Sequence, residues 1–393
     1  MKIYSCAFEP WPTDDRFWKR NSGFICKSLK RIGVHSRVIL PAGPTDDPKY
    51  EVIRASRAEL VSPTWWKSLE IDSVVFMTWG RKCDTPIVMA AKDAGLSIIY
   101  AADDSWMRGR VSLLELFKTT WNRRYHMRRP VRIFNTLVRT PLVFAFLSWK
   151  GRGKIQHYSL ADLIMCYSPV VWGRMPDRLR FRQKVFYAYP PCPAAALTHD
   201  VDNDKIKPVT YSILAVADWT KDSHKRPQFL VDACIILFKN NKNAYIHIYG
   251  RPNPVFSRFV ESLNDIDRHR FIVHGLEDNH KIIEHMSRCH IAVCPSAADA
   301  GPIPMAEALC QGCSVVGGGS IVQWASLCGF GSYAVDSPQQ FADGISAEIE
   351  KWHAHEYDRG KNAEFWRNHY DAEGFAEKVK TFTELRLISK HST

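Results

Sequence analysis

The sequence has no apolar run long enough to cross a membrane as a helix. Such a helix needs about 18 or more consecutive apolar residues, and no stretch of the 393 residues reaches that length. The N-terminus starts like a β-strand and lacks the apolar core of a signal peptide. With 46% hydrophobic and 24% charged residues, we expect a globular, cytoplasmic protein.

The sequence also lacks a disulfide framework. Its 11 cysteines are an odd number and are scattered without regular spacing, which is typical of reduced thiols. The one C-x-x-C pair, Cys310 and Cys313, lies at the end of a predicted helix rather than at its start, and a single pair cannot complete a four-ligand zinc site. We favour packing over a redox or metal role for this pair.

Acidic residues are almost missing from one window. Between residues 107 and 154, twelve Arg or Lys stand against Glu115 alone, a net charge of +11 out of the formal +12 of the chain. Apolar residues recur every three or four positions from Val111 to Tyr125, and a second apolar stretch covers 142–149. Two interpretations stay open: the segment docks on an anionic membrane surface at its inner face, or it buries the apolar stripe and exposes a solvated basic face. No helix-turn-helix, zinc-finger or RNP-like pattern is present, which disfavours nucleic acid as a partner.

Apolar strands alternate with helical patterns in both halves of the chain. In the first half we predict strands at 3–7, 36–40, 73–77, 97–100 and 163–167 and helices at 24–32 and 86–94. In the second half we predict strands at 213–217, 245–249, 270–274, 291–293 and 314–316 and helices at 227–238, 256–263, 281–287 and 304–309. This alternation predicts an α/β protein of two doubly wound, Rossmann-like domains that face a cleft.

Breaks in the pattern set the predicted domain boundaries. A proline-rich stretch at 189–193 and a polar stretch at 199–208 are typical of a linker. We therefore expect an N-terminal domain at 1–190, a linker at 191–210, a C-terminal domain at 211–362 and a helical segment at 363–393 that could return to the N-terminal domain.

The most informative segment is 294–316. A buried strand leads into a polar loop with Asp299 and Gly301, then a short helix with Glu307, then a second buried strand. In an open parallel sheet, loops at the carboxyl ends of strands face the ligand crevice, and a helix N-terminus there offers free N–H groups to an anion. The two acids therefore favour a polyhydroxylated, phosphate-bearing ligand.

Four ordered motifs carry a resemblance to a known family. They are Lys225-Arg-Pro-Gln-Phe-Leu-Val-Asp-Ala233, the strand and turn from Tyr245 to Gly250, Phe271-Ile-Val-His-Gly275, and the Asp-x7-Glu pattern of 294–316. Over about 212–352 the chain resembles the retaining glycosyltransferases of family four, which have the GT-B fold. The resemblance implies a metal-independent hexosyltransferase that uses a nucleoside diphosphate sugar, with no cofactor and a glycan, lipid-linked or small-molecule acceptor.

The resemblance also implies roles for single residues. Glu307 binds the donor ribose, Lys225 neutralises the leaving diphosphate, and Asp299 contacts the sugar. Gly301, Pro302 and Ile303, at the helix start, lie near the donor phosphates.

The sequence departs from the family pattern at three places. Thr220 stands where an Arg is usual, so Lys221 or Arg251 is expected to supply the second cation. Arg226 replaces the glycine after the lysine, and Asp299 replaces a glutamate. These departures keep an alternative open, a non-catalytic GT-B protein that binds a nucleotide sugar or an anionic polymer as a scaffold.

The N-terminal half offers two further candidates. Gly23 opens a helix after the first strand, where related enzymes place a glycine close to the donor diphosphate. Asp103 follows the predicted strand at 97–100 and could act on the acceptor. A helix cap formed by the next residues, Asp104 and Ser105, is the competing interpretation.

Overall fold

The chain forms two compact units. The computed structural model describes residues 1–13, 15–18, 21–43, 51–77, 81–102, 116–117, 120–121, 127, 129–167, 169–173, 178–189, 192, 196, 210–220, 225–296 and 302–391. The N-terminal unit comprises Met1–Arg110, Ala145–Pro191 and Asp371–Thr393, and the C-terminal unit comprises Val111–Phe144 and Cys192–Tyr370.

The N-terminal unit is built on a parallel seven-stranded sheet with the order β3-β2-β1-β4-β5-β6-β7. Its strands are β1 (Ile3–Ala7), β2 (Val38–Pro41), β3 (Val52–Ala55), β4 (Ser73–Met77), β5 (Ser97–Ala102), β6 (Leu163–Cys166) and β7 (Val185–Tyr187). Most side chains of the central strands are fully buried on both faces, which is why these strands are continuous apolar runs.

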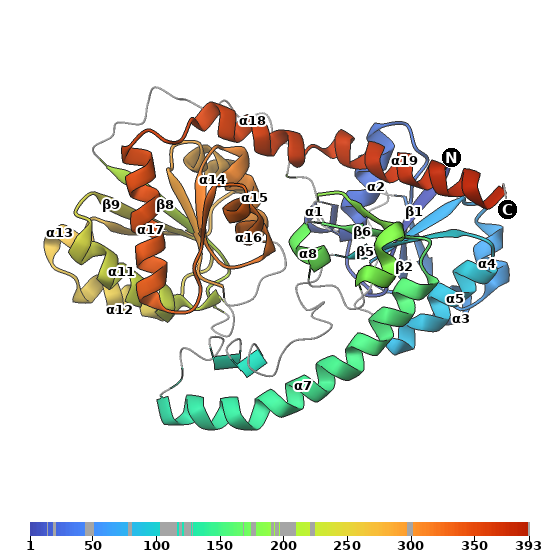
Figure 1. Cartoon of the computed structure of the whole chain (residues 1–393), viewed down its shortest axis with the longest axis horizontal. Helices are drawn as coiled ribbons and strands as arrows, with labels where there is room; N and C mark the ends of the chain where they lie inside the picture. The colour runs from blue at the N-terminus through green and yellow to red at the C-terminus, as the bar shows by residue number, and fades with distance from the viewer. Residues whose placement is uncertain are drawn as a thin grey trace. The chain divides into compact units, whose positions relative to one another are not determined.

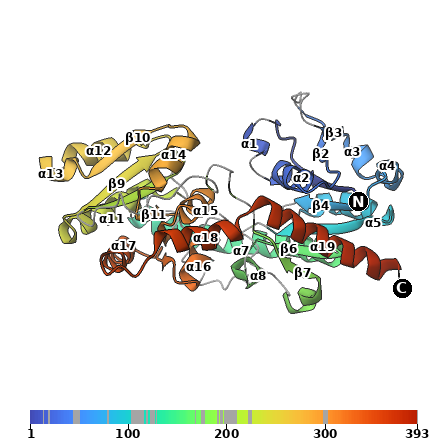
Figure 2. The same cartoon turned by 90° about the horizontal axis from the view of Figure 1, so that it is seen from above.

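Helices cover both faces of this sheet. They are α1 (Asp15–Trp18), α2 (Asn21–Arg31), α3 (Arg57–Leu60), α4 (Pro63–Ser68), η1 (Lys82–Asp84), α5 (Thr85–Asp93), α7 (Arg129–Leu160, which continues into the other unit), α8 (Pro169–Gly173), η2 (Arg178–Lys184) and α19 (Ala372–His391). On one face, Leu29 of α2 and Val379 of α19 pack on Val75 and Ile99. On the other face, Trp66 of α4 and Ile87 of α5 belong to a second cluster. The last helix of the chain is thus part of the N-terminal unit (Figure 1, Figure 2).

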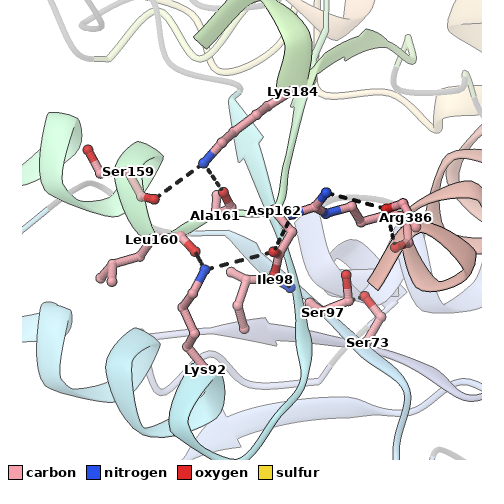
Figure 3. Close-up of polar contacts among 11 residues, drawn as sticks. Ser73, Lys92, Ser97, Ile98, Ser159, Leu160, Ala161, Asp162, Lys184 and Arg386 are labelled. Carbon is pink, nitrogen blue, oxygen red and sulfur yellow. Dashed lines mark hydrogen bonds and ion pairs between the residues drawn. The ribbon is translucent and has the colours of Figure 1, made fainter. Parts of the chain in front are cut away.

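A buried carboxylate at the amino edge of the sheet holds α19 in place (Figure 3). Asp162 is 5% exposed and precedes β6. Its Oδ2 accepts a hydrogen bond from the Ile98 backbone N–H at 3.0 Å. Its Oδ1 lies 3.8 Å from Lys92 Nζ and 3.4 Å from Arg386 Nη2. Asp162 therefore connects two neighbouring strands, α5 and the C-terminal helix.

The C-terminal unit is built on a parallel six-stranded sheet with the order β10-β9-β8-β11-β12-β13. Its strands are β8 (Tyr211–Val216), β9 (Ala244–Tyr249), β10 (Phe271–Gly275), β11 (Ile291–Cys294), β12 (Ser314–Gly317) and β13 (Gly331–Tyr333). Its remaining helices are α11 (Pro227–Asn240), α12 (Pro254–Ser262), α13 (Asp265–Arg268), α14 (Asn279–Met286), α15 (Ile303–Cys310), α16 (Ser320–Leu327), α17 (Pro338–His353) and α18 (Arg359–His369). Phe229 of α11, Phe256 of α12 and Phe341 of α17 share one core cluster with β8 and β9, while α14, α15 and α16 lie on the opposite side of the sheet (Figure 1).

The observed elements confirm the predicted α/β fold class and differ from the prediction in detail. β3, β7 and β13 were not predicted, because each has only three or four residues, which is too short to show a periodic pattern. The second predicted apolar stretch, 142–149, lies within α7, which runs from Arg129 to Leu160 with Pro141 inside it. None of the described helices is long and apolar enough to span a membrane.

Candidate functional site

Glycines bring the loops at the carboxyl edge of the C-terminal sheet into direct contact. Gly317 ends β12 with a φ of +130°, and a Cβ there would lie 2.0 Å from the carbonyl oxygen of Cys294. A Cβ on Gly318 would lie 2.2 Å from the carbonyl oxygen of Ser296. Only glycine allows such an approach. These glycines therefore let the loop after β12 pack around the end of β11.

Arg226 ties three of these loops together. It precedes α11 with a left-handed φ of +49°, a backbone conformation that glycine adopts more readily. Its guanidinium is buried, and it donates from Nε to Pro295 O at 2.5 Å and from Nη1 to Val335 O at 2.9 Å. It also stacks over the Phe229 ring at 3.8 Å. The arginine that departs from the family's glycine is thus an internal support of the loops after β11 and β13.

Glu307 lies in α15 and is 4% exposed. The Asn279 side chain donates a hydrogen bond from Nδ2 to Glu307 Oε1 at 3.3 Å. Asn279 is the first residue of α14 and follows β10. The hydrogen bond therefore connects the start of α14 with α15. The sequence analysis did not find Asn279, because 28 residues separate it from Glu307 and no spacing rule connects them.

The first turn of α15 has fewer N–H donors than its position suggested. Pro302 caps the helix and Pro304 lies within its first turn, and proline has no backbone N–H. The Met305 N–H is engaged with Pro302 O at 2.8 Å. Among the described residues that were predicted to bind the donor here, Ile303 has a backbone N–H at the helix start.

The predicted cations lie on neighbouring loops of the same edge. Lys225 directly precedes Arg226 and the start of α11. Arg251 is exposed and follows Gly250, whose N–H donates to Gly275 O at 2.7 Å. A Cβ on Gly250 would lie 1.9 Å from Ala217 O, so this glycine lets the loops after β8 and β9 meet.

Gly23 has a packing role within the N-terminal unit. It lies in the first turn of α2 and is buried. A Cβ there would come within 2.6 Å of the Phe17 ring and 2.8 Å of Phe17 O. Contact with the donor remains a prediction for this residue. Four other predicted residues, Asp103, Lys221, Asp299 and Gly301, lie outside the part of the chain that the structure describes.

The cysteines of the C-x-x-C pair are buried and point to different partners. Cys310 Sγ lies 3.8 Å from Cys192 Sγ, whereas the Cys313 thiol donates to Met286 O and Cys289 O. Burial raises the pKa of the Cys313 and Cys192 thiols. Both pKa shifts oppose thiolate formation, which supports the packing interpretation.

Comparisons with known proteins identify the fold and one domain. Residues 210–351 match the family model of the glycosyl transferases group 1. A search of curated proteins found no match. Among solved structures, HepE (Alr3699) from Anabaena in complex with UDP has a TM-score of 0.62 at 14% identity, with 97% of this chain and 99% of that chain covered. The apo lipopolysaccharide outer core galactosyltransferase WaaB gives 0.61 at 13%, with 99% and 100% covered.

A third structure, the alpha,alpha-trehalose 6-phosphate synthase from Burkholderia multivorans, gives a TM-score of 0.64 at 9% identity, with 100% of this chain and 99% of that chain covered. At these identities the likeness shows the fold. The family match adds the domain type, and it covers the segment that holds Lys225, Arg251 and Glu307. The predicted fold class is confirmed, because the chain has the GT-B fold of glycosyltransferases. The predicted resemblance is confirmed for residues 210–351, which form a glycosyl transferases group 1 domain.

Proposed function

We propose that this glycosyltransferase moves a hexose from a nucleoside diphosphate sugar to a glycan, lipid-linked or small-molecule acceptor with retention of configuration. The observation that carries the proposal is the buried Glu307 carboxylate, held by Asn279 at the carboxyl edge of the group 1 domain's sheet. HepE has been solved with UDP and with UDP and glucose, which makes a UDP-sugar the first donor to test.

Each proposed role follows from the chemistry of the donor. A carboxylate accepts hydrogen bonds from both ribose hydroxyls at once, which suits Glu307. Negative charge grows on the diphosphate as the glycosidic bond breaks, so a cation at Lys225 stabilises the transition state more than the ground state. The departing phosphate oxygen takes the acceptor's proton, and the new bond forms on the face that the diphosphate leaves. Asp299, Asp103, Lys221 and Gly301 keep their predicted roles as part of this proposal.

Donor binding and turnover test the proposal together. Purified protein is screened by thermal shift against UDP, GDP and their sugars, and donor hydrolysis or transfer is then followed. We expect Glu307→Gln to weaken nucleotide binding about tenfold or more, because a charge-assisted pair of hydrogen bonds is lost. We expect Lys225→Ala to lower kcat by about a hundredfold.

Matched surface variants separate these effects from general damage. Glu261→Gln and Lys239→Ala change an exposed glutamate and an exposed lysine of the same unit, and both should keep wild-type turnover. Wild-type turnover in Glu307→Gln and Lys225→Ala would remove the assigned site. Tight nucleotide binding without turnover on any acceptor would favour the scaffold alternative.

A membrane-docking role for α7 is supported by a separate observation. The first half of this helix exposes large apolar side chains, with Phe134 67%, Leu137 57% and Leu142 66% exposed. Arg129 and Arg139 are exposed on the same segment, within the window of net charge +11. Thr136 and Thr140 are buried instead. An apolar face with adjacent cations fits the surface of an anionic bilayer.

Liposome sedimentation tests this role. We expect binding to anionic vesicles that weakens with salt, and at least a tenfold loss of binding in a Phe134→Ser, Leu137→Ser double variant, since both buried apolar area and insertion depth fall. Lys239→Ala is the control. Equal sedimentation of the double variant and the wild type would contradict the role.

A further inference from the structure

Three histidines converge on the α14 side of the C-terminal sheet. His247 lies in β9, His274 near the end of the edge strand β10, and His285 in α14. Each offers one ring nitrogen, and these nitrogens lie within 4.8 Å of one another. His274 is exposed, whereas His247 and His285 are half-buried. The group therefore has one side open to solvent.

An irregularity in the strand pairing brings His274 into this group. Val273 pairs with Ile248 and Gly275 pairs with Tyr249, so the register between β10 and β9 shifts at His274. The extra residue of a bulge redirects a side chain. As a result, His247 Nδ1 and His274 Nε2 lie 3.0 Å apart, and the His247 and His285 rings meet edge to face with centroids 4.4 Å apart.

Tyr249 orients two of the rings. Its hydroxyl lies 2.7 Å from His285 Nδ1, and its ring stacks on His274 at 4.3 Å with an interplanar angle of 2°. When His285 Nδ1 donates to this hydroxyl, the lone pair of His285 is on Nε2. Histidines that bind metals usually donate their second nitrogen to an outer partner in this way, which fixes the tautomer and the ring orientation.

Burial disfavours the charged form of all three rings. Burial, helped by His285 and His274, lowers the pKa of His247 to about 3. Burial, helped by His274 and Arg288, lowers the pKa of His285 to about 4. Burial also lowers the pKa of His274, against the opposing effect of the Glu277 carboxylate. Arg288 itself is paired with Glu284 at 2.8 Å.

We propose that His247, His274 and His285 form a binding site for a divalent transition metal of the Zn²⁺ class, with the fourth position open to solvent. Nitrogens bound to tetrahedral zinc at about 2.0 to 2.1 Å lie roughly 3.3 Å apart. Rotations that move the ring nitrogens by about an ångström therefore complete the geometry. Imidazole is a ligand that zinc, copper and nickel accept.

A metal bound here would cross-link the edge of the sheet to α14. β9, β10 and α14 would share one ion, and α14 begins with Asn279, the residue that contacts Glu307. The site is separate from the proposed transfer chemistry, which needs no metal. The metal is expected to stabilise the unit and to hold Asn279 in place.

Metal titration without nucleotide tests the site. Tag-free protein is stripped with a chelator and titrated with Co²⁺, whose visible d–d absorption reports tetrahedral coordination, and Zn²⁺ is then used as a competitor. We expect one equivalent to bind and to raise the Tm. Tyr249→Phe should weaken binding about tenfold, because the partner that fixes His285 is lost.

Two histidine variants decide the outcome. His274→Ala changes an exposed ligand in β10 and should abolish the absorption, whereas His280→Ala changes an exposed histidine of α14 and should leave it intact. Circular dichroism confirms that both variants are folded. Binding of well under one equivalent, or equal Co²⁺ absorption in His274→Ala and the wild type, overturns the proposal.

Discussion

Arg226 is buried at the carboxyl edge of the C-terminal sheet and Asp162 at the amino edge of the N-terminal sheet, and the two charges have different kinds of partner. Arg226 donates to two backbone carbonyls of loops that follow strands. Asp162 accepts from a backbone N–H and lies beside Lys92 and Arg386. Arg226 supports loops at the edge where open α/β sheets bind ligands. Asp162 attaches α19 to the amino edge of the N-terminal sheet.

From this comparison we infer that the edge of a parallel sheet at which a charge is buried indicates the role of that charge. A charge at the carboxyl edge should affect both stability and donor binding. A charge at the amino edge should affect stability alone. His290 is a buried titratable side chain at the amino edge of the C-terminal sheet, where it precedes β11, so its protonation should likewise affect stability alone.

Acid titration of His290 should give the largest effect. The Ser212 N–H donates to His290 Nδ1 at 3.2 Å, and burial, with Arg359 as a second cause, lowers the pKa of His290 to about 3. The unfolded state, with an ordinary pKa of about 6.5, binds the proton first. Stability is therefore highest above about pH 6.5 and falls as the pH drops towards 3, by roughly 5 kcal/mol in total.

Denaturant melts between pH 7 and 4 isolate this contribution. His290→Asn keeps an acceptor near Nδ1 but cannot be protonated, so its stability should fall less steeply with acid than that of the wild type. Nucleotide affinity at pH 7 should be the same in both proteins. Parallel pH profiles would show that His290 does not carry the acid sensitivity.

Arg226→Ala should have the second-largest effect. The free energy of unfolding should fall by about 3 kcal/mol, because two buried carbonyls lose their donor. Arg226→Gly relaxes the left-handed backbone and should be about 1 kcal/mol more stable than Arg226→Ala. Both variants should also weaken nucleotide binding, since the loops after β11 and β13 lose their support. Urea denaturation and thermal shift with UDP measure the two effects, and unchanged UDP binding in both variants would break the proposed distinction between the edges.

Asp162→Asn should cost about 2 kcal/mol, less than a fully buried ion pair, because its two cationic partners are partly exposed. Asparagine keeps an oxygen for the Ile98 N–H. Donor KM and kcat should not change, which urea melts and transfer assays check side by side. A change in KM with unaltered stability would reverse the role that we assign to this edge.

Arg386→Gln should have the smallest effect, below about 1 kcal/mol, because its side chain is 40% exposed. The expected readout is faster proteolysis within α19 with normal turnover. Lys380→Gln, on the same helix, is the control. Equal proteolysis rates in Arg386→Gln and Lys380→Gln would remove Arg386 from the attachment of α19.

Much of the fold follows from local patterns in the sequence. β1 and β4 have the predicted bounds, and α11 and α15 lie within a few residues of them, because apolar runs and turn residues specify such elements locally. β3 and β13 were missed, since short edge strands carry little apolar pattern. The first half of α7 exposes apolar side chains, but most of the predicted stripe at 111–125 lies outside the described residues, so membrane docking stays a prediction.

The sequence by itself determined the alternating architecture, the family of residues 210–351 and Glu307 as a site candidate, because motif order and spacing are local properties. Only the tertiary structure decided what Arg226 does, because its two acceptors lie 69 and 109 residues away. The same holds for the contact of Asn279 with Glu307, the meeting of three histidines, and the attachment of α19 through Asp162. Each depends on which strands are neighbours in the sheet, and no spacing along the chain records that order.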